Sequence, residues 1–137
     1  MKKILGLDVG EKRIGVALAE GIFISSFGVI ENASYQSVIL EIAKICHLEN
    51  IERIVIGVPK SKDTFQVDKV HSFAMELAKS VNLPIEYVDE TLTSKEAERM
   101  LKESKIDPKS KEYKQEIDKI AAKLILEQYV NKLDKNL

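Results

Sequence analysis

The sequence predicts an α/β fold in which a mixed five-stranded sheet carries helices on both faces. Three short apolar segments come first and are separated only by turn residues. Stretches with helical spacing of apolar residues then alternate with two further apolar runs. Helical crossovers make those two later strands parallel to the first one. The predicted strand order is therefore 3-2-1-4-5, with strand 2 antiparallel to strand 1.

The first three segments predict an antiparallel meander. They cover residues 4–9, 14–20 and 22–31 and are rich in Ile, Val, Leu and Ala. Residues 10–13 separate the first two segments, and Gly21 opens the turn before the third. Short apolar segments joined by such turns are typical of neighbouring antiparallel strands.

Helical periodicity begins after Ser34. Apolar residues recur at intervals of three and four over 38–46 and over 67–81, which predicts two helices. The apolar runs 53–59 and 84–90 predict buried strands. A capping-box pattern at 93–96 predicts a helix to about residue 103. After a lysine-rich loop at 104–111, a last helix is expected over 112–132, followed by a frayed tail at 133–137.

Composition predicts one soluble domain spanning residues 1–137. The chain has 45% apolar and 31% charged residues, which suffices for a core without disulfides. Its net charge of −1 argues against bulk attraction to nucleic acid but leaves room for a local basic surface. The single cysteine, Cys46, lies among apolar helical positions, so we expect an inert buried thiol. No membrane segment is predicted, and we expect a cytoplasmic protein.

Four acidic residues are predicted to meet at one edge of the sheet. Asp8 lies near the carboxyl end of the first strand, and Asp89 and Glu90 end the last strand. Asp118 lies in the final helix, on the same face as two alanines that would let this helix approach the sheet. Carboxyl ends of parallel strands are where ligands bind in open α/β sheets.

Such a group of carboxylates predicts divalent cations. Several ionised acids in one cleft repel one another, whereas Mg²⁺ is held by a few carboxylates together with substrate phosphate. Paired metal ions activate water and stabilise the leaving oxygen in phosphodiester cleavage. Each acid taken alone also fits a cap, a turn or a solvated surface position. Their predicted placement on one edge favours the shared role.

Four blocks of the sequence resemble one known family. They are GLDVGEKRIGVALAE near the start, RIVIGVP in the middle, VDETLTSKEAERML, and EIDKIAAKLILEQYV near the end. In this order they are similar to the YqgF family of RNase H-like proteins. Members of that family are described as Holliday junction resolvases and as pre-16S rRNA nucleases. The resemblance covers nearly the whole chain and implies an RNase H-like fold.

The resemblance also implies roles for individual residues. Asp8, Glu90 and Asp118 would be catalytic and would hold Mg²⁺ or Mn²⁺, with Asp89 as a further metal ligand beside them. A chain with this site would hydrolyse phosphodiester bonds.

The same resemblance implies a set of substrate-binding residues. Gly10 would make the tight turn after the first acid, and Lys12 and Arg13 would face substrate phosphate. Thr93 and Ser94 would present hydroxyls and free amides at a helix N-terminus, which is a natural anion site.

Two departures from the family pattern concern substrate contacts more than the metal site. Thr91 stands where the family has an arginine, which removes a cation beside the metals. The loop after Pro59 lacks the glycine that is usual there, and Lys60 and Lys62 could supply charge instead.

The predicted function is therefore a metal-dependent nuclease acting on structured nucleic acid, with precursor 16S ribosomal RNA as the expected substrate. Two alternatives stay open at this point. The same site could cleave four-way DNA junctions, which would require a homodimer rather than a monomer. The protein could also be a ribosome-assembly factor with weak catalysis, as its near-neutral charge and Thr91 would allow. Zinc is not expected, because His47 and His71 have no partners at ligand spacing.

Overall fold

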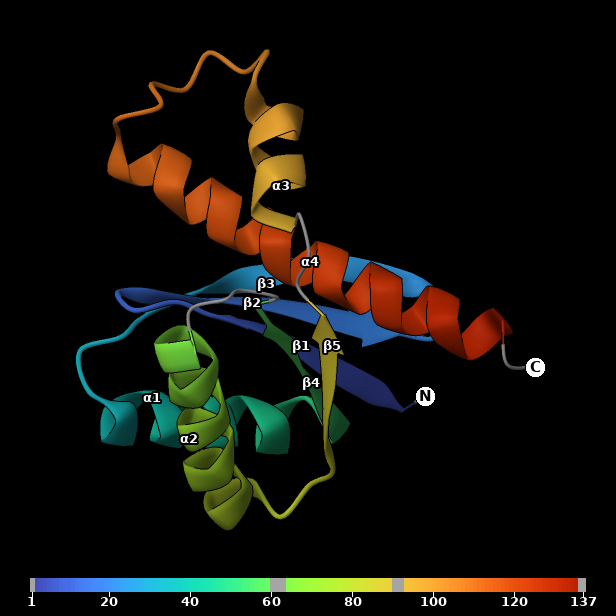
Figure 1. Ribbon diagram of the computed structural model, residues 1–137. Helices are drawn as coiled ribbons and strands as arrows, with labels where there is room; N and C mark the ends of the chain where they lie inside the picture. The colour runs from blue at the N-terminus through green and yellow to red at the C-terminus, as the bar shows by residue number, and fades with distance from the viewer. Residues whose placement is uncertain (1, 60–63, 90–92, 136–137) are drawn as a thin grey trace.

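The fold is built on a twisted five-stranded sheet (Figure 1). The computed structural model describes residues 2–59, 64–89 and 93–135. The strands are β1 (Lys3–Val9), β2 (Arg13–Glu20), β3 (Phe23–Glu31), β4 (Ile51–Val58) and β5 (Ile85–Asp89). They lie in the order β3-β2-β1-β4-β5. The predicted α/β fold and strand order are confirmed.

Strand directions follow from the connections. The tight turns around β2 make it antiparallel to both β1 and β3. Helical crossovers return β4 and β5 parallel to β1. In the β1–β2 register, Asp8 lies directly opposite Gly15. The carboxyl ends of β1, β4 and β5 therefore meet at one edge of the sheet.

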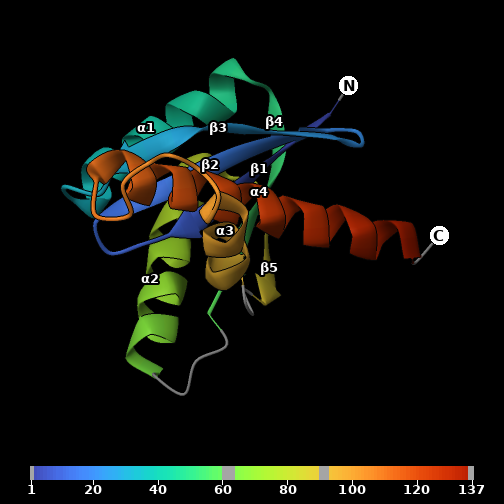
Figure 2. The ribbon, with the colours of Figure 1, turned by 90° about the horizontal axis from the view of Figure 1, so that it is seen from above.

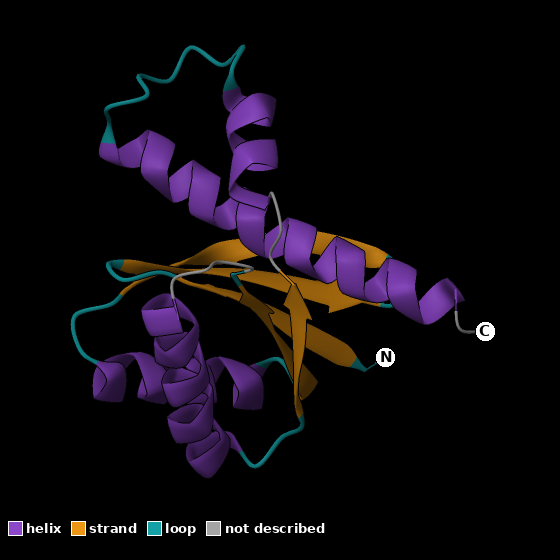
Figure 3. Cartoon of the chain, viewed as in Figure 1, coloured by secondary structure: helices purple, strands orange, loops and turns teal. Residues whose placement is uncertain are grey.

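Helices cover both faces of the sheet (Figure 3). One face is covered by α1 (Tyr35–Leu48) and α2 (Thr64–Val81). The long helix α4 (Lys111–Lys135) lies across the other face, and α3 (Thr93–Leu101) packs against α4 rather than on the strands. None of the described helices combines the length and the apolar character that crossing a bilayer requires.

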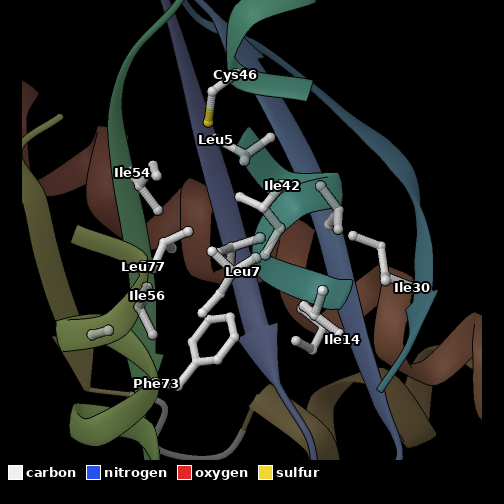
Figure 4. Close-up of a cluster of buried hydrophobic side chains, with 14 of the residues drawn as sticks. Leu5, Leu7, Ile14, Ile30, Ile42, Cys46, Ile54, Ile56, Phe73 and Leu77 are labelled. Carbon is white, nitrogen blue, oxygen red and sulfur yellow. The ribbon is translucent and has the colours of Figure 1, made fainter. Parts of the chain in front are cut away.

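The core between the sheet and α1/α2 consists of large apolar side chains (Figure 4). They alternate along β1 and β4 and recur with helical spacing in α1 and α2. Fully buried members include Leu5, Leu7, Ile14, Ile42, Ile54, Ile56, Phe73 and Leu77. This side of the molecule has the period-two and period-3.6 patterns that the sequence displays.

Small residues on the opposite face bring part of α4 close to the strands, and Val55, Ile125, Leu126 and Tyr129 complete the buried cluster there. Figure 2 shows α4 running across the sheet. Ala17 and Ala19 of β2 pack in one cluster with Ala122 of α4. At Gly15, a Cβ atom would overlap the backbone carbonyl of Asp118. Only glycine permits this approach of helix backbone to strand.

Some element boundaries differ from the predicted ones. β4 begins at Ile51 rather than at residue 53, because the Ile51 side chain is already buried in the core. α1 begins after Ser34, whose hydroxyl oxygen accepts a hydrogen bond from the Ser37 amide as an N-cap. α4 continues past the expected end at Lys132 and reaches Lys135.

Candidate active site

Asp8 lies on the α4 face of the sheet, at the carboxyl end of β1. Leu5 and Leu7 belong to the core under α1 and α2, whereas Ile4 packs in the cluster under α4. Alternation along the strand therefore directs Asp8 toward α4. Its side chain is partly exposed, so the carboxylate is within reach of solvent and of a ligand.

Asp118 is brought to the same place by the contact of α4 with Gly15. The Asp118 backbone lies directly against Gly15, and Gly15 is the cross-strand neighbour of Asp8. Ala121, Ala122 and Ile125 continue the same face of α4 and are fully buried. The approach of α4 at Asp118 thus depends on Gly15, and a Cβ at Gly6 of β1 would likewise overlap the Leu126 side chain of α4.

An ion pair between Arg13 and Asp118 lies beside this contact. The Arg13 Nε atom donates a hydrogen bond of 2.7 Å to Oδ2 of Asp118. Each side chain is 19% exposed, so the pair is partly shielded from water. Arg13 is on the α4 face because it alternates with Gly15 and Ala17. The sequence did not predict that this cation would contact one of the acids.

Burial and charge act in opposite directions on Asp118. Partial burial is the largest effect and raises the pKa of the Asp118 carboxyl above its usual range. The hydrogen bond and charge of Arg13 lower this pKa, while the nearby charge of Glu31 raises it slightly. The site therefore places a carboxylate where a neighbouring cation is strongly favourable.

The β1–β2 turn holds the other residues of the first block. The Gly10 amide donates a hydrogen bond of 3.0 Å to the Arg13 carbonyl and so closes the turn. The Asn32 side-chain amide donates to the Gly10 carbonyl at 3.1 Å and ties the turn to the end of β3. Lys12 is exposed at the tip of this turn. The turn thus presents an exposed cation close to Asp8 in the sequence.

The remaining predicted site residues are placed differently or lie outside the described residues. Asp89 is exposed at the end of β5, on the side of Tyr87, whose ring centroid is 5.0 Å from that of His71 in α2. Alternation thus directs Asp89 away from the α4 face on which Asp8 lies. Glu90 is outside the described residues. Thr93 and Ser94 begin the backbone of α3.

The described acids fit part of a metal site. Carboxylate oxygens are the ligands that Mg²⁺ prefers. The Asp118 carboxylate already forms an ion pair with the Arg13 guanidinium. Within residues 2–59, 64–89 and 93–135, no three His, Cys, Asp or Glu side chains cluster closely enough to hold a metal ion. Asp8 and Asp118, whose backbones come close through Gly15, are therefore candidate ligands within the described part of the chain.

A second polar cluster on the α4 face was not predicted. Arg53 of β4 donates a hydrogen bond of 2.6 Å to the Tyr129 hydroxyl and pairs with Glu86 of β5 at 3.4 Å. The Tyr129 hydroxyl in turn donates to Glu86. Burial, together with Glu86, raises the pKa of Tyr129. Alternation in the two strands, which puts Arg53 and Glu86 on one face, is the signal that could have predicted this link between β5 and α4.

Curated relatives match over most of the chain. A protein of Crocosphaera subtropica is 41% identical over 132 residues, covering 93% of this chain and 91% of the relative. A protein of Trichormus variabilis is 39% identical over 132 residues, covering 93% and 86%. One from Clostridium acetobutylicum is 35% identical over 136 residues, covering 96% and 99%. All three carry the name "Putative pre-16S rRNA nuclease".

Solved structures share the fold at low sequence identity. RuvC of T. thermophilus in complex with a Holliday junction substrate superposes with a TM-score of 0.63 at 12% identity, and the match covers 96% of both chains. The Fowlpox virus resolvase in complex with Holliday junction DNA gives 0.55 at 14% identity, covering 96% of this chain and 98% of that one. These likenesses support the RNase H-like fold.

Residues 2–132 match the family described as "RuvX: Holliday junction resolvase". This match spans all four sequence blocks, the β1–β2 turn and both acids that meet across Gly15. The chain therefore belongs to the RuvX family, which is the YqgF family that its sequence blocks resemble.

Proposed function

We propose that this protein is a metal-dependent endonuclease that hydrolyses phosphodiester bonds, with the 5′ region of precursor 16S ribosomal RNA as its substrate. The names carried by its relatives support the substrate. A single buried cysteine fits a reducing compartment, so we place the activity in the cytoplasm.

The approach of α4 to β2 at Gly15 is the observation that carries this proposal. It places Asp118 over the cross-strand neighbour of Asp8, although the two acids are far apart in the sequence. Two carboxylates held on one face by helix and strand backbones are positioned more rigidly than acids on loops. Such rigid placement is what hydrolysis of a phosphodiester requires, because small displacements of catalytic groups reduce rates strongly.

Each residue of the site has a proposed task. Asp8 and Asp118, joined by Glu90, would hold Mg²⁺ or Mn²⁺, with Asp89 near the same edge. Bound there, the metal would lower the pKa of water and neutralise developing charge. Arg13 compensates the charge of Asp118 before substrate arrives.

Positive groups beside the acids would bind the substrate backbone. Lys12, exposed on the turn that Gly10 closes, would contact phosphate on one side of the cleaved bond. Arg13 lies next to it and could share its guanidinium between Asp118 and a phosphate. Thr93 and Ser94 would add contacts from the start of α3.

Cleavage of four-way DNA junctions is the second candidate. The family's description as a Holliday junction resolvase favours it. This reaction requires two symmetric cuts, and therefore a homodimer with two copies of the site. The rRNA reaction requires only a monomer, so substrate and oligomeric state should be measured together.

The test offers three substrates to the full chain in the presence of Mg²⁺ or Mn²⁺: a precursor 16S rRNA fragment, a single-stranded RNA and a four-way DNA junction. We expect metal-dependent cleavage of the precursor RNA, and its loss in Asp8→Asn and in Asp118→Asn. The matched control is Asp68→Asn, which changes an exposed acid of α2 and should leave the rate unchanged.

Three outcomes would contradict parts of the proposal. Equal cleavage by wild type and by Asp8→Asn would rule out the metal site. Cleavage of the junction alone, by a dimer, would replace the RNA substrate with the second candidate. Tight RNA binding without any cleavage would identify an assembly factor instead of an enzyme.

A further inference from the structure

A pocket lies at the same edge of the sheet as Asp8 but on the opposite face. Its volume is about 560 Å³. The first turn of α1, the first turns of α2 and the chain segments that follow β1 and β3 line it. The residues used below are Val9, Tyr35, Phe65, Gln66 and Lys69.

Two aromatic rings line this pocket while remaining accessible. Phe65 at the start of α2 is 64% exposed. Tyr35 at the start of α1 packs edge-on against Phe73, at 5.5 Å between ring centroids, and is still 37% exposed. Exposed rings at the mouth of a pocket leave apolar surface in water, which a flat ligand would cover.

Polar groups around the rings suit a nitrogen heterocycle. The Gln66 side chain offers both donors and acceptors at the rim. The Lys69 Nζ lies 4.6 Å from the centroid of the Phe65 ring and 3.3 Å from Glu11 Oε1. Glu11 is therefore partly neutralised, and the ammonium of Lys69 lies over the Phe65 ring, where it adds positive charge next to a bound base.

The pocket adjoins the candidate active site at the end of β1. Val9 lines the pocket and follows Asp8 directly in the chain, so strand alternation directs the two side chains to opposite faces of one edge. A strand of nucleic acid whose phosphate lies at Asp8 could therefore turn one neighbouring base over the edge and into the pocket.

We propose that this pocket binds one unstacked nucleobase adjacent to the cleaved bond, with Phe65 and Tyr35 as its stacking surfaces. The inference rests on the proposed function, because it assumes a nucleic-acid substrate at Asp8. Stacking on aromatic rings tolerates any base, so the pocket would select for single-stranded or distorted structure next to the cut rather than for sequence. A fully paired duplex could not fill it without extruding a base.

The test measures binding without cleavage. The full chain carrying Asp8→Asn is titrated with single-stranded RNA and with single-stranded DNA that contain the fluorescent base 2-aminopurine. We expect its fluorescence to be quenched on binding, because the base stacks on a ring. Adding Phe65→Ala should remove the quenching and weaken binding about 5- to 150-fold, the range for loss of one stacked base.

Two further variants make the test specific. Phe65→Trp keeps a stacking surface and should retain the quenching. Phe23→Ala removes a ring that is 73% exposed in β3, outside the pocket, and should change nothing. Equal loss in Phe23→Ala would show that any exposed ring contributes, and would overturn the assignment to this pocket.

The outcomes separate the pocket from the proposed function. If wild type cleaves RNA but Phe65→Ala neither weakens binding nor restores fluorescence, the pocket is wrong and the nuclease stands. If Phe65→Ala does both while wild type cleaves nothing, the pocket stands without the nuclease. If neither nucleic acid binds, the pocket is wrong as well.

Discussion

The two faces of the sheet are built in opposite ways. Between the sheet and α1/α2, large branched and aromatic side chains fill the space, with Phe73 and Leu77 fully buried. Under α4, glycine and alanine bring backbones together, and the polar contacts Arg13–Asp118 and Arg53–Tyr129 lie at the margins. The first face separates its elements by side chains, whereas the second brings them into backbone contact.

The two faces contribute differently to stability and to the candidate site. A thick apolar layer buries the most surface and stabilises the fold, but its large side chains keep helix and strand backbones apart. A thin layer of small residues buries less, yet it fixes the position of a helix residue relative to a strand residue. The candidate site lies on the thin side because Asp8 and Asp118 could not be held together across large side chains.

The largest effect is expected in the core between the sheet and α1/α2, which we call the thick face. Phe73→Ala would leave a cavity in the main core and should lower the free energy of unfolding by about 3–5 kcal/mol. Urea unfolding followed by circular dichroism measures this change. Met75→Ala, in the same helix but at a residue that is 65% exposed, is the matched control and should cost little. The readout is stability alone, because Phe73 also packs against Tyr35 of the proposed pocket. An effect as small as that of Met75→Ala would contradict a tightly packed core.

The next effect is expected where α4 contacts the sheet, which we call the thin face. Gly15→Ala would push the Asp118 carbonyl away and should cost about 1–3 kcal/mol of stability. Displacing Asp118 by about 1 Å should also reduce cleavage about a hundredfold in molecules that remain folded. Unfolding curves and cleavage rates, measured on the same samples, give both values.

Gly28→Ala is the control for this substitution, because a Cβ at Gly28 in β3 would meet no atom within 4 Å. It should have nearly wild-type stability and activity. If Gly15→Ala behaved in the same way as Gly28→Ala, the backbone contact would not be what positions Asp118.

A smaller effect tests the ion pair of the thin face. Arg13→Ala leaves a partly buried carboxylate without its donor, so stability should fall by about 1–3 kcal/mol and the pKa of Asp118 should rise further. The pKa is measured by NMR titration of the Asp118 carboxyl carbon. Lys79→Ala removes an exposed pair with Glu76 in α2 and should change stability by less than about 0.5 kcal/mol. Equal effects would mean that the Arg13 pair is no better shielded than a surface pair.

The last effect appears only at high pH and tests whether water is excluded from the thick face. Burial raises the pKa of the Cys46 thiol from 9.0 to about 11. The folded protein thus stabilises the protonated thiol, and this contribution is complete below about pH 9 and is lost as the pH rises toward 11. Urea midpoints should fall over that range in wild type. They should fall less in Cys46→Val, in which the raised pKa of Tyr129 still contributes to the fall.

At neutral pH, thiol labelling of the folded protein should be about a hundredfold slower than thiol labelling of the unfolded protein. Rapid labelling under native conditions would contradict a buried thiol.

The fold of the thick face was largely predictable because its information is local. Strand alternation in β1 and helical spacing in α2 are visible in the sequence, and each pattern selects one element. The strand order followed from the connections alone. Boundaries shifted where a single buried residue, such as Ile51, extended a strand beyond the apolar run.

The candidate site was only partly predictable because its information is not local. The placement of Asp8 and of the Asp118 backbone on one face of the sheet followed from topology and from the alanines of α4, while a metal site shared by their carboxylates stays a prediction. The pairing of Arg13 with Asp118, and the role of Gly15 in their approach, depend on the depth at which a helix packs on a strand. That depth is set by matching small residues on two distant segments, which no single stretch displays. Asp89 was expected beside these acids, and alternation in the short strand β5 directs it to the other face.

The contact between α4 and β2 also sets when the protein becomes competent during synthesis. Arg13 and Asp118 are separated by 105 positions in the chain. β1 and β2 are made well before α4, and a domain generally folds as a unit once its segments are available. Asp8 then has no Asp118 beside it until α4 is released. The candidate site that includes Asp118 therefore cannot form before α4 has been made.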